Sequence, residues 1–263
     1  MKTCIYQYWN GSRPAYTYGS EELFRSYADR IGADYFIGDG SISINCLHKR
    51  YFGALLPFYS NRFWKYDYVL YVDMDVVPVH DCCVDIFANI TGDIMMAEEP
   101  RQPEMRENMK GSITAANDKI WAKVLKRWWN VDVELDFLQR PVVYNSGVVA
   151  YSNNAIRNFK KLLPSVLSYQ LAMKLSGLPR FYSLDQNYLN AFLRKPDVNF
   201  SKLPACWNSQ VTRWTDLHDV SHLEDNRNNE TQFIHLQHGA DKNKMTKTQI
   251  MDVSKRQFEF KLC

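Results

Sequence analysis

The sequence contains no apolar stretch that could cross a membrane as a helix. No run of about 18 apolar residues occurs anywhere in the chain. Its first residues, Met1 to Tyr6, lead straight into a strand-like segment and lack the apolar region of a secretory signal peptide. We therefore expect a protein without a transmembrane segment that is located in the cytoplasm.

Cysteines are few, and they are not arranged for metal binding. The six cysteines are scattered, no Cys-x-x-Cys pair occurs, and none of them has the spacing of zinc ligands. Cys82 and Cys83 are adjacent, which is an awkward arrangement for a disulfide. We therefore predict reduced thiols, as is usual in the cytosol.

A strong excess of one charge is also missing. The 32 lysines and arginines against 29 acids leave a net charge of +3, and no dense basic block occurs before residue 240. This composition argues against a nucleic-acid partner. Aromatic residues make up 14% of the chain, and because aromatic rings stack on sugars and bases, this content favours a carbohydrate or nucleotide ligand.

The apolar pattern is that of one α/β domain, without repeats or a clear linker. Buried strands are predicted at residues 3–8, 34–37, 68–73, 93–97, 142–151 and 231–235, and helices at 20–28, 47–63, 117–129, 154–175 and 184–194. The βαβ start is typical of a nucleotide-binding sheet, with Ser20 expected to cap its helix and Gly32 to end it. Residues 101–118 are polar and irregular, which predicts a mobile active-site loop.

The segment from Tyr68 to Val79 is the most informative part of the chain. An apolar run ends in Asp73 and Asp75, and side chains two residues apart on an extended chain point to the same side. Two carboxylates at the carboxyl end of a buried strand repel each other unless a cation lies between them, which predicts a divalent metal site that also holds a phosphate. The motif also fits solvated acids, or the Asp-x-Asp of haloacid dehalogenase-type phosphatases.

Polar residues recur in three later segments, in positions that fit such a site. They are Asn145, Ser146 and Gly147 within a predicted strand, Asp185 and Gln186 at the start of a predicted helix, and His235, His238, Gly239 and Lys242 around the end of the last predicted strand. Together with the Asp-x-Asp segment, they resemble the retaining glycosyltransferases of the GT-A fold. The most similar group is glycosyltransferase family 8, which includes glycogenin and lipopolysaccharide galactosyltransferases.

The resemblance implies a fold and an activity. The fold would be a Rossmann-like, mixed and mainly parallel sheet flanked by helices, in a single domain over residues 1–263. Residues 1–100 would form the nucleotide-binding half, 101–245 the donor-sugar and acceptor half, and 246–263 a basic tail. The activity would be transfer of a hexose or pentose from a nucleoside diphosphate sugar, which we expect to be a UDP-sugar, to an acceptor glycan hydroxyl with retention of configuration.

The resemblance also assigns metal ligands. Asp73 and Asp75 match the Asp-x-Asp motif that binds Mn²⁺, or Mg²⁺, and through it the donor diphosphate. The family's third ligand is a histidine that ends a strand, and His235 fits that pattern. One residue is inserted before the glycine and lysine that hold the phosphates, here Gly239 and Lys242, so His238 is the alternative ligand.

Donor-binding and catalytic residues are implied in the same way. Asn145, Ser146 and Gly147 match a segment that lines the donor-sugar pocket. Asp185 and Gln186 match a pair beneath the anomeric carbon, where they would carry the catalytic role.

Two further donor contacts are expected near the start of the chain. Arg50, or the adjacent Lys49, matches an arginine that reaches the donor sugar and phosphate. Tyr8, with Trp9 or Gln7, ends the first strand and is placed by that location to contact the base.

Other functions stay open at this point. An inverting transferase would need a carboxylate base, for which Glu98 and Glu99 are the candidates. A phosphatase would use Asp73 as nucleophile and Asp75 as acid and base. A nucleotidyltransferase would need a glycine-rich loop near residues 8–16, where only Gly11 occurs, and a carbohydrate-binding module would not need metal and diphosphate features together.

Overall fold

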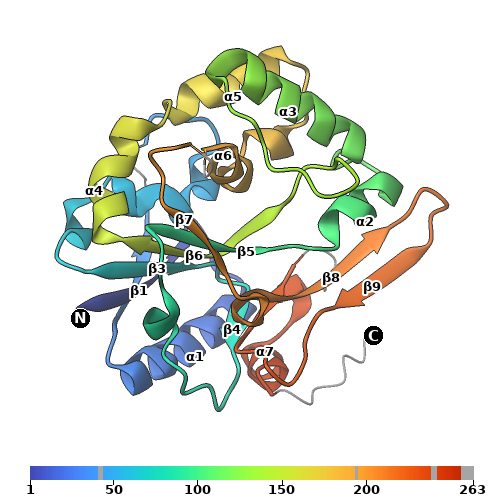
Figure 1. Cartoon of the computed structure of the whole chain (residues 1–263). Coiled ribbons are helices and arrows are strands. Elements are labelled where there is room, and N and C mark those ends of the chain that lie inside the picture. The colour runs from blue at the N-terminus through green and yellow to red at the C-terminus, as the bar shows by residue number, and fades with distance from the viewer. Residues whose placement is uncertain (41–43, 193–194, 238–241, 256–263) are drawn as a thin grey trace.

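Figure 1 shows the chain as a computed structural model that describes residues 1–40, 44–192, 195–237 and 242–255. The strands are β1 (Thr3–Trp9), β2 (Asp34–Asp39), β3 (Tyr68–Val72), β4 (Val76–Pro78), β5 (Ile94–Glu98), β6 (Tyr144–Ser152), β7 (Phe200–Leu203), β8 (Ser209–Thr215), β9 (Ser221–Asp225) and β10 (Phe233–Leu236). The helices are α1 (Ala15–Ile31), α2 (Gln102–Asn108), α3 (Ala115–Trp129), α4 (Asn153–Leu162), α5 (Val166–Leu175), α6 (Asp185–Phe192) and α7 (Lys247–Val253).

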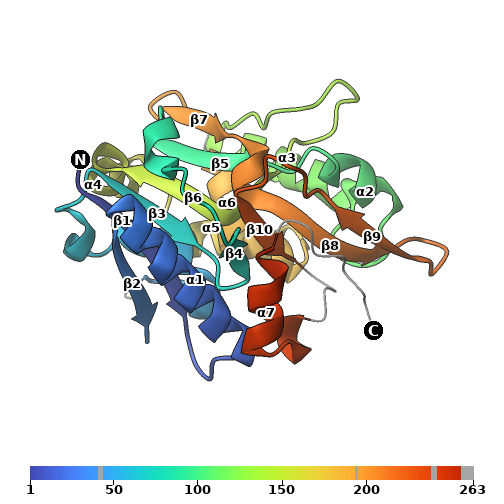
Figure 2. The same cartoon turned by 90° about the horizontal axis from the view of Figure 1, so that it is seen from below.

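A six-stranded sheet in the order β2-β1-β3-β6-β5-β7 runs through the molecule. β1 pairs in parallel with β2 and β3, and β5 with β7, whereas β6 runs antiparallel to β3 and β5. The predicted mixed, mainly parallel sheet is therefore confirmed. A second sheet has the order β4-β10-β8-β9, and Figure 2 shows it beside the first.

Helices cover both faces of the large sheet (Figure 1). α1 and α7 lie on one face, and α3 to α6 lie on the other. Successive residues of a strand alternate between the two cores, so that Ile5 and Leu70 face α1 while Tyr6 and Tyr71 face the opposite layer. Because both faces are buried, the strands have continuous apolar runs rather than alternating ones.

The Asp-x-Asp segment connects the two sheets. β3 belongs to the large sheet and β4 to the small one, and only Asp73, Met74 and Asp75 lie between them. The N–H of Asp73 donates to the carbonyl of Gly147 at 2.8 Å, and the N–H of Leu236 donates to the carbonyl of Asp75 at 2.9 Å. The segment is thus held by β6 on one side and by β10 on the other.

The prediction of a helix over residues 47–63 is wrong. Three short 3₁₀ turns occur there instead, at Lys49–Tyr51, Gly53–Phe58 and Asn61–Phe63. Pro57 lies within the second turn and has no N–H to donate to a helical ladder. Gly53 packs so closely on the ring of Tyr8 that a Cβ would clash with it. The segment therefore forms three short turns instead of one continuous α-helix.

The boundaries of the first helix differ from the prediction at one end. α1 begins at Ala15, so Ser20 lies inside the helix and does not cap it. The hydroxyl of Ser20 instead donates to the carbonyl of Val76 at 2.6 Å, which ties α1 to β4. Gly32 ends the helix in the left-handed conformation, as predicted.

Two later predictions also need correction. Residues 101–118 are not irregular throughout, because α2 occupies Gln102–Asn108 and Thr114 caps α3. The helix predicted over 154–175 is divided into α4 and α5 around Pro164, since proline disfavours helical conformation in the residue before it.

The cysteines within the described residues are thiols that form no disulfide with one another: Cys4, Cys46, Cys82, Cys83 and Cys206. Cys263 lies outside the described residues. Among the helices that the structure describes, none has both the length and the apolar character needed to cross a membrane.

Candidate active site

Asp73 and Asp75 converge through a turn. The N–H of Val76 donates to the carbonyl of Asp73 at 3.1 Å, which closes a turn over residues 73–76. The sequence predicted this convergence from the two-residue period of an extended strand. The two carboxylates do meet, but a tight turn at the sheet junction brings them together.

Asp73, Asp75 and His235 form a cluster that could hold a metal ion. One ligand atom from each lies within 4.8 Å of the other two, and Nε2 of His235 is 3.4 Å from Oδ1 of Asp75. His235 reaches this point because β10 pairs it with Val76, the residue after Asp75. Two carboxylates and an imidazole suit a divalent ion such as Mn²⁺. His238, the alternative ligand, lies outside the described residues.

The two aspartates have perturbed pKa values of opposite sign. Burial, followed by repulsion from Asp75, raises the pKa of Asp73 to about 6. Burial also opposes ionisation of Asp75, but Lys242 and His235 together hold the pKa of Asp75 well below its usual range. Asp75 is therefore the more acidic member of the pair, and Asp73 gains most from an added cation.

Lys242 supplies the counter-charge in this arrangement. Its ammonium donates to Oδ2 of Asp75 and, at 3.0 Å, to the carbonyl of Leu236. On the other side, the hydroxyl of Tyr71 donates to Oδ1 of Asp73 at 2.5 Å. Gly239, expected beside Lys242 in the phosphate site, lies outside the described residues.

A bulge in β6 brings Asn145, Ser146 and Gly147 to the cluster. Ala97 of β5 pairs with Asn145, whereas its neighbour Met96 pairs with Val149. Three residues of β6 therefore lie between partners that are adjacent on β5. Bulges of this kind re-aim side chains at the ends of strands. At Gly147, a Cβ would clash with the imidazole of His235 and the amide oxygen of Asn145, so glycine is what allows the histidine to approach.

α6 places Asp185 and Gln186 beside this bulge. Oε1 of Gln186 accepts from the N–H of Ser146 at 3.3 Å and from Nδ2 of Asn145 at 3.4 Å. Burial, and then the charge of Asp73, raises the pKa of Asp185 to about 8. Asp185 is therefore a neutral acid through most of the neutral pH range and can donate a hydrogen bond.

Two solved structures resemble this one over nearly the whole chain. A glycosyltransferase involved in the glycosylation of the major capsid of PBCV-1 matches with a TM-score of 0.51 and 12% identity, over 97% of this chain and 98% of its own. The galactosyltransferase LgtC, solved with donor and acceptor sugar analogues, matches with a TM-score of 0.52 and 12% identity, over 95% of each chain. The chain has the GT-A fold. No protein-family model and no curated protein matches its sequence.

Other residues predicted to contact the donor lie at the end of β1 and in the first 3₁₀ turn after β2. Tyr8, at the end of β1, is buried and its hydroxyl donates to the carbonyl of Gly40 at 2.7 Å. Gln7 contacts the cluster segment directly, because its Nε2 donates to the carbonyl of Asp73 at 3.2 Å. Arg50 is exposed, and its guanidinium donates to the hydroxyl of Tyr51 at 2.7 Å rather than to the carboxylates.

Of the two candidate bases, Glu99 is the one that contacts the β6 bulge. Glu98 pairs with Lys202 at 2.6 Å near the surface. Glu99 is 3% exposed, and its carboxylate accepts from the amide of Asn145 and, at 2.9 Å, from Nε2 of Gln237.

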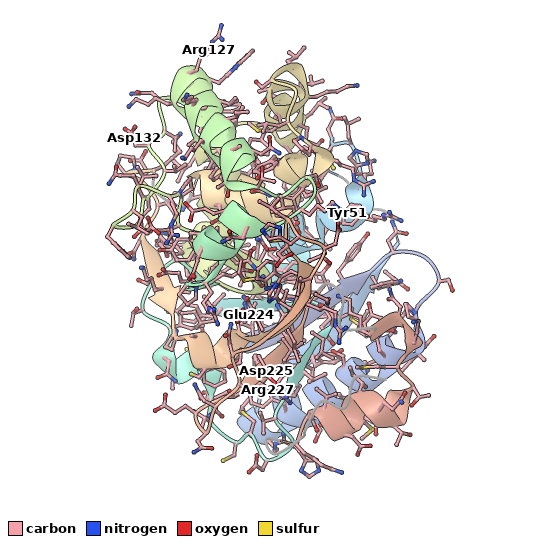
Figure 3. The ribbon with its side chains drawn as sticks, turned by 90° about the vertical axis from the view of Figure 1, so that its right-hand side faces the viewer. Tyr51, Arg127, Asp132, Glu224, Asp225 and Arg227 are labelled. Carbon is pink, nitrogen blue, oxygen red and sulfur yellow. The ribbon has the colours of Figure 1, made fainter. Side chains whose placement is uncertain are left out.

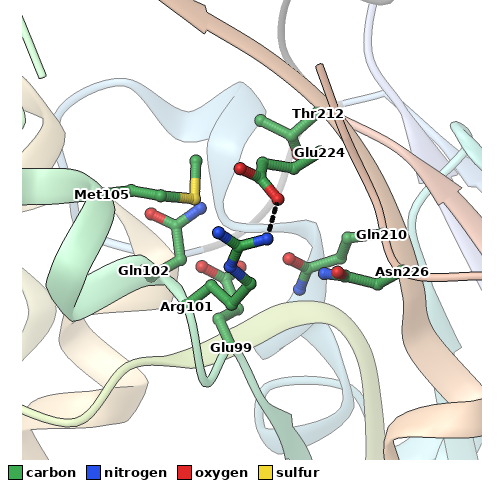
Figure 4. A pocket seen from close by; sticks show the side chains of 8 residues that line it. All are labelled: Glu99, Arg101, Gln102, Met105, Gln210, Thr212, Glu224 and Asn226. Atoms are coloured by element: carbon green, nitrogen blue, oxygen red, sulfur yellow. Dashed lines mark hydrogen bonds and ion pairs between the residues drawn. The ribbon is translucent and has the colours of Figure 1, made fainter. Parts of the chain in front are cut away.

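Glu99 also lines a pocket that the sequence analysis did not identify (Figure 4). The pocket lies between the start of α2 and the β8–β9 hairpin, and Arg101 and Glu224 pair across it at 2.5 Å. Its lining residues are Glu99, Arg101, Gln102, Met105, Gln210, Thr212, Glu224 and Asn226. One sequence signal could have predicted this pocket. Polar residues lie two positions apart on β8, at Gln210 and Thr212, and so point to the same side of the strand.

Asp185→Asn is expected to flatten the pH dependence of stability. The raised pKa of about 8 means that folded Asp185 keeps its proton where the unfolded residue has lost it. The unfolding free energy therefore falls as pH rises from about 4 to 8, and becomes independent of this group above that range. Thermal unfolding in EDTA at several pH values should show a smaller decline in the variant.

The exposed, surface-paired Asp132 offers a matched control for this experiment. Asp132→Asn should keep the wild-type decline. An equally steep decline in Asp185→Asn would contradict the raised pKa of Asp185.

Proposed function

We propose that this protein is a metal-dependent glycosyltransferase. It moves a hexosyl or pentosyl group from a nucleoside diphosphate sugar, expected to be a UDP-sugar, to a hydroxyl of an acceptor glycan. The observation that carries this proposal is the Asp73, Asp75 and His235 cluster at the junction of the two sheets of a GT-A fold. The two solved proteins compared above are glycosyltransferases, which favours transfer over phosphomonoester hydrolysis.

The three clustered side chains would hold a Mn²⁺ or Mg²⁺ ion. When bound, such an ion acts as a Lewis acid that neutralises charge on the departing diphosphate. In this structure the ammonium of Lys242 donates to the carboxylate of Asp75 and neutralises its charge. Once a divalent ion takes over that carboxylate, the ammonium would be free to contact the diphosphate, as the resemblance implies. The insertion before Lys242 changes its spacing from the family pattern but still leaves it at the cluster.

Asp185, Gln186 and the β6 bulge would bind the donor sugar. Gln186 is held against the bulge by Ser146 and Asn145, so its side chain is fixed before any ligand enters. The neutral carboxyl of Asp185 would donate to a sugar oxygen without adding repulsion against the diphosphate. Catalysis would then rest on positioning and on electrostatic stabilisation of an oxocarbenium-like state.

Retention is proposed from the resemblance, and Glu99 defines the alternative. Its buried carboxylate lies next to Asn145 of the bulge that would bind the donor sugar, and an inverting reaction would need such a carboxylate within reach of the acceptor hydroxyl. Proton NMR of the anomeric configuration of the product distinguishes the two outcomes.

A donor panel tests the proposed function. Purified protein is heated with UDP- or GDP-sugars, each with Mn²⁺ or with EDTA. A donor at about 100 times its Kd stabilises the protein by about 2.7 kcal/mol, which raises Tm by several degrees. We expect this shift with a UDP-sugar only when Mn²⁺ is present, together with slow donor hydrolysis.

A different result would reject the proposal. The phosphatase alternative predicts release of phosphate from a simple phosphomonoester with Mg²⁺ and no stabilisation by any nucleotide sugar.

A further inference from the structure

Asn208 connects two parts of the candidate site. It lies in a short turn before β8 and is 3% exposed. Its Nδ2 donates to Oδ1 of Asn145 at 2.9 Å, and its Oδ1 is 3.0 Å from Nδ1 of His235. The side chain therefore lies between the β6 bulge and the metal-binding histidine without contacting the carboxylates itself.

The backbone N–H of Gly147 fixes the orientation of the two side-chain amides that connect it to His235. The N–H of Gly147 can only donate, so the Asn145 atom that faces it at 2.7 Å must be the amide oxygen. That oxygen also faces Asn208, which must present its NH₂ group to Asn145 and its oxygen to His235. An amide oxygen only accepts hydrogen bonds, so Nδ1 of His235 carries the proton.

The other amide contact of Asn145 gives the same orientation. Its Nδ2 faces the carboxylate of Glu99, which accepts hydrogen bonds. Reversing Asn145 would place oxygen against carboxylate and N–H against the N–H of Gly147. The hydrogen bonds from Gly147 through Asn145 and Asn208 to His235 therefore allow only one assignment of donors and acceptors.

We propose that Asn208 is a positioning residue that selects the metal-binding tautomer of His235. A neutral imidazole has one protonated and one bare nitrogen, and a metal binds only the bare one. With the proton held on Nδ1 by Asn208, the bare Nε2 faces Asp75 at 3.4 Å, where a cation would bind. This inference rests on the metal site of the proposed function.

The tautomer can be observed directly. Protein labelled with ¹⁵N-histidine, metal-free and at alkaline pH, is studied by two-bond ¹H–¹⁵N correlation NMR, with His235→Gln used to assign the signals. We expect wild-type His235 to be protonated at Nδ1. In Asn208→Ala the acceptor is gone, so the proton should move to Nε2, where the carboxylate of Asp75 accepts it.

Metal affinity gives a second readout. Binding of Mn²⁺ is followed by loss of the EPR signal of the free ion. Because groups that orient a metal-binding histidine typically change affinity by about 10- to 100-fold, Asn208→Ala should weaken binding to that extent. Asn208→Asp keeps an acceptor oxygen toward Nδ1 and should retain the wild-type tautomer.

The neighbouring Ser209 provides the matched control. It is also buried, and its hydroxyl bonds to Thr231 at 2.9 Å rather than to His235. Ser209→Ala should therefore lose a buried hydrogen bond and yet keep both the tautomer and the Mn²⁺ affinity.

Two results would overturn the proposal: a wild-type His235 protonated at Nε2, or an Asn208→Ala protein with unchanged tautomer and affinity. If Asn208→Ala does not fold, the wild-type and Asn208→Asp spectra still decide, because both must show the Nδ1 proton. A tautomer that depends on Asn208 in a protein that binds no Mn²⁺ would support the positioning role and reject the metal in the proposed function.

Discussion

Asp75→Asn is expected to lower the rate of sugar transfer by about 10³-fold. Asp75 is the more acidic carboxylate of the cluster, and it contacts both His235 and Lys242. Asparagine keeps the shape but removes the charge that binds a divalent ion. A metal supplies several kcal/mol of transition-state stabilisation, and each 1.36 kcal/mol corresponds to about a tenfold change in rate.

Initial rates at saturating donor and Mn²⁺ measure this loss. Asp132→Asn is the control, because Asp132 pairs with Lys126 at 2.7 Å on the surface, and Figure 3 shows it at the outer margin of the molecule on the side of α3. The control should retain its rate. Near-normal transfer by Asp75→Asn in EDTA would show that the cluster does not act through a metal.

Gly147→Ala is expected to abolish Mn²⁺ binding and to destabilise the fold. The added methyl group would clash with the imidazole of His235 on β10 and the amide oxygen of Asn145 on β6. Overpacking of this kind costs about 1–3 kcal/mol, which lowers Tm by several degrees. Because the histidine must move away to relieve the clash, the metal site should lose a ligand.

Gly92→Ala separates these two effects. A Cβ there would lie 2.7 Å from Oγ of Ser201, so the position is also crowded, but Ser201 belongs to β7 at the edge of the sheet. This variant should lose stability and keep wild-type Mn²⁺ affinity. Thermal unfolding in EDTA and Mn²⁺ titration measure the two quantities, and normal affinity in Gly147→Ala would contradict the expected displacement of His235.

Local patterns predicted much of the sheet. The apolar runs around β1, β3, β5 and β6 were recognisable because each strand is buried on both faces. β8 and β9 were not predicted, since β9 alternates between exposed and half-buried positions and carries mostly polar residues. The 3₁₀ turns before β3 depend partly on Pro57, which is visible in the sequence, and partly on how Gly53 packs against Tyr8, which is not.

Some residues of the candidate site were also predictable from local patterns, whereas the position of others was not. Asp73, Asp75 and the Asn145-Ser146-Gly147 segment were identified by residue type and spacing. Arg50 was identified as well, but it lies at the surface and donates to Tyr51.

Residue type and spacing identified the chemical groups of the site, an Asp-x-Asp segment after an apolar strand and a late histidine. Which of these groups meet depends on how the chain folds. The register of β10 on β4 brings His235 to Asp75, the bulge in β6 turns Asn145 toward Asn208, and the backbone of Gly147 sets the direction of the hydrogen bonds. Strand period and helix capping involve neighbours in sequence, whereas these contacts depend on the pairing of segments far apart in the chain.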